Sequence, residues 1–98
     1  LPALVCGCDG VVSGCSGPFP EAFVAVYKAF QSGDLEGARK AQVAATELVK
    51  LMQFGGDMSI FKNILTFRGV TGGHMRKPLL DLTDEQVAQL KQQVAPYI

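Results

Sequence analysis

The chain has 98 residues, 48% of them hydrophobic and 18% charged, and its nine basic and nine acidic side chains cancel. This length permits one small domain at most, well short of the roughly 250 residues of a complete eight-stranded barrel. The balanced charge, without a run of either sign, gives no electrostatic footprint for nucleic acid or for an anionic membrane surface.

Hydropathy argues against a membrane segment. No apolar run approaches the roughly 18 residues of a membrane span. The first residues also lack the basic start of a signal peptide, so we expect a cytoplasmic protein. The charged share is below the roughly 25% of an average soluble domain. We therefore expect part of the apolar surface to meet another chain or a missing segment.

The cysteines do not predict a disulfide framework or a metal site. Cys6, Cys8 and Cys15 are an odd number, and a zinc site would require a second pair of ligands, for which the single His74 is the only candidate. We expect buried, reduced thiols. The glycine-rich stretch 7–17 lacks the Lys-Ser/Thr ending of a phosphate-binding loop and the spacing of a dinucleotide fingerprint, so no cofactor is predicted.

In chain order, the first seven residues form a short apolar stretch that ends in Gly7, a residue suited to a helix C-terminus. Val11 and Val12 then predict a buried strand over residues 9–13, because continuous aliphatics are typical of a parallel strand. A single strand cannot satisfy its own backbone hydrogen bonds. Its neighbours must come from outside these 98 residues, or the region is not a strand here.

Helical patterns follow. Apolar side chains recur at helical spacing and predict a helix that ends at Gly33, with this stripe in the core; they are Phe19, Phe23, Val26, Tyr27 and Phe30. A second helix is expected from Asp34 to about Phe54, capped by the aspartate, with small alanines that favour close helix packing.

Two further helices complete the chain. Asp57 can cap a third helix that runs through Arg68. Residues 70–82 contain Gly72-Gly73 and Pro78 and should be extended and irregular. Thr83 and Gln86 form a capping box, flanked by Leu82 and Val87 as a hydrophobic staple, for a final helix to about Val94.

Four motifs occur in a fixed order along nearly the whole chain. They are a Gly-x-Asp-Gly lead-in followed by two valines, Ser-Gly and a proline-led helix start in 7–21, the helix junction 31–36, the segment 60–65 around Lys62, and Met-Arg-Lys-Pro-Leu at 75–79. In this order they resemble the C-terminal third of the dihydrodipicolinate synthase and N-acetylneuraminate lyase family of pyruvate-dependent class I aldolases.

The resemblance implies an α/β parent protein with a (β/α)8 TIM barrel. Residues 1–33 would be the end of barrel helix 7, strand 8 and helix 8, and residues 34–98 a C-terminal extension of three helices. This chain alone would be mostly α-helical with one barrel strand. It begins on the end of an element and so looks like an excerpt whose strand needs the missing N-terminal part of the barrel. Family members suggest a homotetramer.

The resemblance also implies an activity. Family members form a Schiff base between a lysine and pyruvate and make or break a carbon–carbon bond with an aldehyde or 2-keto acid. The lysines here are Lys28, Lys40, Lys50, Lys62, Lys77 and Lys91, and none lies on the predicted strand. We therefore expect no catalytic residue in this chain, with the nucleophile and its partner tyrosine upstream and Lys62 structural.

This chain would instead contribute pocket wall. Active sites of such barrels lie at the C-terminal ends of the strands, which places Val12, Ser13 and Gly14 there, with Gly10 allowing close approach of the neighbouring strand. By the resemblance, Val12 packs beside pyruvate. Ser13 offers its hydroxyl either to substrate or to a backbone carbonyl. Family members often carry an asparagine at Gly17, and neuraminate-cleaving ones a serine or threonine at Gly14, which leaves the second substrate open.

Other interpretations remain. The chain could be a non-enzymatic helical assembly module or a catalytically empty fragment, and pairing of residues 9–13 as a strand would distinguish these from the aldolase. A third candidate is a small enzyme that acts through Cys15 and His74. Arg76 is either a carboxylate clamp or a residue that ties the preceding loop to the barrel.

Overall fold

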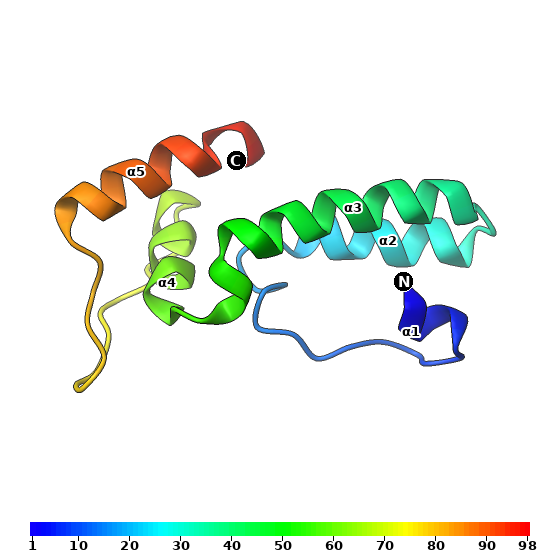
Figure 1. The fold of residues 1–98 in the computed structure, drawn as a ribbon, viewed down its shortest axis with the longest axis horizontal. Coiled ribbons are helices and arrows are strands. Elements are labelled where there is room, and N and C mark those ends of the chain that lie inside the picture. Colours follow the sequence, from blue (N-terminus) through cyan, green and yellow to red (C-terminus); the bar gives the residue numbers. More distant parts are fainter. The chain divides into compact units, whose positions relative to one another are not determined.

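The computed structural model describes residues 1–98, which form helices and no β-strand (Figure 1). They divide into two compact units, Leu1–Lys50 and Leu51–Ile98. The helices of the first unit are α1 (Pro2–Val5), α2 (Pro20–Gln31) and α3 (Leu35–Leu51), whose last residue falls at the boundary. Those of the second are the 3-10 turn η1 (Gln53–Gly55), α4 (Met58–Phe67), α5 (Asp84–Val94) and the 3-10 turn η2 (Ala95–Tyr97).

The segment between α1 and α2, called the unpaired segment because it forms no strand ladder, has no regular secondary structure. Residues 9–13 donate no backbone hydrogen bond, and a turn follows, in which the Gly17 amide donates to the Gly14 carbonyl at 3.1 Å. The predicted strand at residues 9–13 is therefore wrong for this chain by itself. The physical reason is the absence of a second extended segment with which its peptide groups could form a ladder. Val11 and Val12, expected to be buried, are 75% and 104% exposed.

Three helices end in the same way, at a glycine in each case, two of which (Gly7 and Gly33) the sequence predicted as helix ends. Gly7, Gly33 and Gly69 have φ angles of 95°, 80° and 83°, in the left-handed region that favours glycine. At each end the glycine amide donates to the carbonyl three residues earlier, and the next amide donates to the carbonyl five residues earlier. This pair of bonds is the Schellman motif, which satisfies carbonyls that the helix leaves free.

The predicted helix starts are confirmed. Asp34 Oδ1 accepts a hydrogen bond from the amide three residues on at 2.8 Å, and Asp57 Oδ1 accepts one from the amide two residues on at 2.9 Å. Thr83 and Gln86 form the reciprocal capping box, each side chain accepting from the other residue's amide. These contacts occupy N–H groups that have no partner inside the helix.

Helix α3 ends at Leu51, three residues before the predicted end at Phe54. Gln53 and Phe54 have φ angles of 52° and 53°, and such left-handed residues interrupt the α-helical hydrogen-bond pattern. The side chain of Phe54 is 72% exposed. The chain therefore leaves the helix before the predicted end at Phe54.

Each unit has its own set of buried side chains. In the first unit they include Phe19, Val26, Ala38, Ala45 and Leu48, and in the second Met52, Ile60, Phe61, Ile64, Leu90 and Val94. The predicted aromatic stripe is only partly core, because Tyr27 is 44% exposed. In the second unit α4 and α5 contact each other. None of the helices combines the length and the apolar character that a membrane crossing requires.

The cysteines are more accessible than predicted. Cys6 and Cys8 are exposed and Cys15 is half-buried, and none forms a disulfide. The expectation of buried thiols is wrong for Cys6 and Cys8. They lie at the C-terminus of α1 and in the unpaired segment that follows, where no core residue covers them.

Candidate functional site

An apolar hollow of about 650 Å³ lies in the first unit, between α1, the unpaired segment and α2. Its polar lining residues include Asp9, Ser13, Ser16, Tyr27 and Gln42, and no lysine or histidine lines it. Such a hollow suits an apolar group. The larger apolar side chains around it are Leu1, Leu4, Val11, Phe23, Val24 and Val26.

The hollow includes two of the four residues predicted as pocket wall. Gly10 and Ser13 line it, whereas Val12 and Gly14 lie outside it and are exposed. The carbonyl of Ser13 accepts a hydrogen bond from Ser16 Oγ at 2.7 Å, which fixes the turn into α2. The structure thus places the four residues on one segment but not around one cavity.

Four of the five residues 9–13 line the hollow. Asp9, Gly10, Val11 and Ser13 lie along it, while Val12 lies outside it with its side chain fully exposed. Sequence reasoning did not single out Asp9 and Val11 as lining residues.

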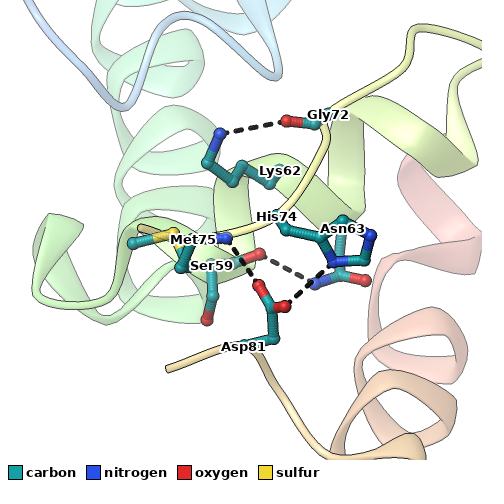
Figure 2. Close-up of polar contacts among 7 residues, drawn as sticks. All are labelled: Ser59, Lys62, Asn63, Gly72, His74, Met75 and Asp81. Carbon is teal, nitrogen blue, oxygen red and sulfur yellow. Dashed lines mark hydrogen bonds and ion pairs between the residues drawn. The ribbon is translucent and has the colours of Figure 1, made fainter. Parts of the chain in front are cut away.

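A second cluster of polar side chains joins α4 to the loop 70–82 (Figure 2). Lys62 Nζ donates a hydrogen bond to the carbonyl of Gly72 at 3.0 Å, and the Gly72 amide donates to Thr66 Oγ1 at 3.2 Å. Thr66 Oγ1 in turn donates to the carbonyl of Lys62 at 3.0 Å. One turn of α4 thus holds both polar backbone groups of Gly72, which confirms the extended, irregular loop predicted here.

Asp81 joins two parts of the same loop by binding His74 and Met75. Its carboxylate accepts a hydrogen bond from the Met75 amide at 2.7 Å and lies 2.9 Å from His74 Nδ1 (Figure 2). The Met75 amide, and after it His74, lower the pKa of Asp81 below its ordinary value of 3.8, with a smaller contribution from the charge of Lys62. The side chain of His74 is 90% exposed, as expected for a surface loop residue. No sequence motif had pointed to Asp81.

Of the six lysines, one is half-buried and five are exposed. A nucleophilic lysine needs a free amine in an apolar pocket. Lys62 is half-buried but donates to a carbonyl, and the other five lysines are exposed. Arg76 is also exposed. Every buried side-chain nitrogen and oxygen atom has a hydrogen-bond partner, so no buried polar atom is left to indicate a ligand.

Comparison with known proteins gives a consistent family. A sequence model described as the dihydrodipicolinate synthetase family matches residues 1–96. A DapA-like lyase of Halobacterium salinarum, itself uncharacterized, is 36% identical over 94 residues, which cover 96% of this chain and 31% of that protein.

Two relatives carry the names of different reactions. A 4-hydroxy-tetrahydrodipicolinate synthase of Anaeromyxobacter dehalogenans is 32% identical over 91 residues, covering 93% of this chain and 31% of the relative. An N-acetylneuraminate lyase of Clostridium perfringens is 30% identical over 92 residues, covering 94% of this chain and 32% of the relative. The chain thus spans about a third of the length of the curated relatives that it matches.

Replacement of Gly72 should loosen the loop. An alanine Cβ at this position would lie 2.0 Å from the carbonyl oxygen of Lys62, so backbone has to move. We expect Gly72→Ala to lower the free energy of unfolding by about 1–3 kcal/mol, as overpacking typically does. Urea unfolding followed by circular dichroism measures the change. Gly10→Ala is the matched control, because its Cβ meets nothing within 4 Å; equal losses in the two variants would contradict the packing argument.

The bonds to Asp81 should respond to acid. The pKa of Asp81 is lower in the folded chain than in the unfolded chain, so the ionised carboxylate stabilises the folded state at pH values above the unfolded pKa. This stabilisation is lost as the pH falls through the folded pKa. The Met75 amide chemical shift should therefore titrate with a midpoint below 3.8, and the titration should vanish in Asp81→Asn. Asp84→Asn is the control and should leave the midpoint unchanged. A midpoint above 3.8 in the parent chain would rule out the stabilised carboxylate.

Proposed function

Because the chain belongs to the dihydrodipicolinate synthetase family, we propose that it is the C-terminal part of a lyase-type enzyme that forms a Schiff base with pyruvate. The enzyme makes or breaks a carbon–carbon bond between pyruvate and an aldehyde or 2-keto acid. The observation that carries the proposal is the match over residues 1–96, together with relatives named as a synthase and as a lyase. The reaction belongs to a protein about three times as long as this chain.

The order of elements supports a position at the end of a (β/α)8 barrel. Residues 1–33 supply the end of helix 7, strand 8 and helix 8, which correspond to α1, the unpaired segment and α2. Residues 34–98 supply the helical extension with α3, α4 and α5. In the proposed parent, neighbouring strands provide the hydrogen-bond partners that residues 9–13 lack here.

The position of Val12 supports it as a wall of the pyruvate pocket. In a barrel, the active site lies at the C-terminal ends of the strands. Val12 is near the C-terminal end of residues 9–13, lies outside the hollow beside α2 and is fully exposed. Gly10 and Gly14 leave room for neighbouring backbone. Ser13 shares the hollow with α2, which favours bonding to backbone over contact with substrate.

An apolar wall has a chemical purpose in such a site. Desolvation disfavours the ammonium form of a lysine and so increases the fraction of neutral amine that can attack the carbonyl carbon of pyruvate. Val12 supplies part of that dry surface. The proposal places the nucleophile outside these 98 residues. The bond of Lys62 to the Gly72 carbonyl and the exposure of the remaining lysines support this placement. The parent is proposed to be a cytoplasmic homotetramer.

Borohydride trapping tests the proposal. The source protein is incubated with pyruvate and sodium borohydride, which reduces a Schiff base to a stable secondary amine, and its intact mass is measured under denaturing conditions. We expect a species roughly three times heavier than this chain with one adduct, because active-site desolvation favours a single lysine. The 98-residue chain treated in parallel is the control and should carry no adduct.

Two results would contradict the proposal. A source protein with the mass of this chain and no adduct would favour a helical assembly module or a catalytically empty fragment. An adduct on the 98-residue chain would place the nucleophile within it, and Lys62→Arg would then be the first variant to test.

A further inference from the structure

We draw no further inference here: the strongest candidate, the apolar hollow between α1, residues 9–13 and α2, is an unpartnered apolar face, and nothing in the structure shows what covers it.

Discussion

Peptide groups that leave a regular element must find other hydrogen-bond partners, and this requirement organises the chain. At Gly7, Gly33 and Gly69 a left-handed glycine turns the backbone so that the next amides satisfy the last helical carbonyls. These three ends decide where α1, α2 and α4 stop and where each connection begins. Between α1 and α2 the chain forms no strand, and residues 9–13 donate no backbone hydrogen bond.

The unpaired segment links the fold to the proposed function. Asp9, Gly10, Val11 and Ser13 line the hollow beside α2, whereas Val12 lies outside it and is fully exposed. In the proposed barrel, Val12 would face the interior, where an apolar side chain helps to keep an amine neutral. The rest of the chain contributes no comparable chemistry. The polar cluster around Lys62 and Asp81 connects α4 to the loop 70–82. Its donors bind acceptors of the same chain, which indicates a structural role.

Local signals in the sequence predicted the helices well. The helix caps and the glycine terminators depend only on neighbours within a few residues, so the local sequence predicts them. The caps are Asp34, Asp57 and Thr83. Predictions that depend on distant partners were less successful. No strand forms at 9–13, because no second extended segment pairs with it, and no core covers the thiols of Cys6 and Cys8. Of the predicted pocket wall, Gly10 and Ser13 line a hollow, but a site shared with upstream strands cannot be assembled from one segment.

The central claim is that residues 9–13 become a parallel barrel strand when the rest of the protein is present. Amide hydrogen exchange of Gly10, Val11, Val12 and Ser13 tests it most directly, with the 98-residue chain compared with the longer source protein. We expect rapid exchange in the short chain, where these amides have no backbone acceptor, and strong protection in the longer protein, where central strands open only with large parts of the structure. Equally rapid exchange in both would contradict the claim, because the segment would then be unpaired even in the complete enzyme.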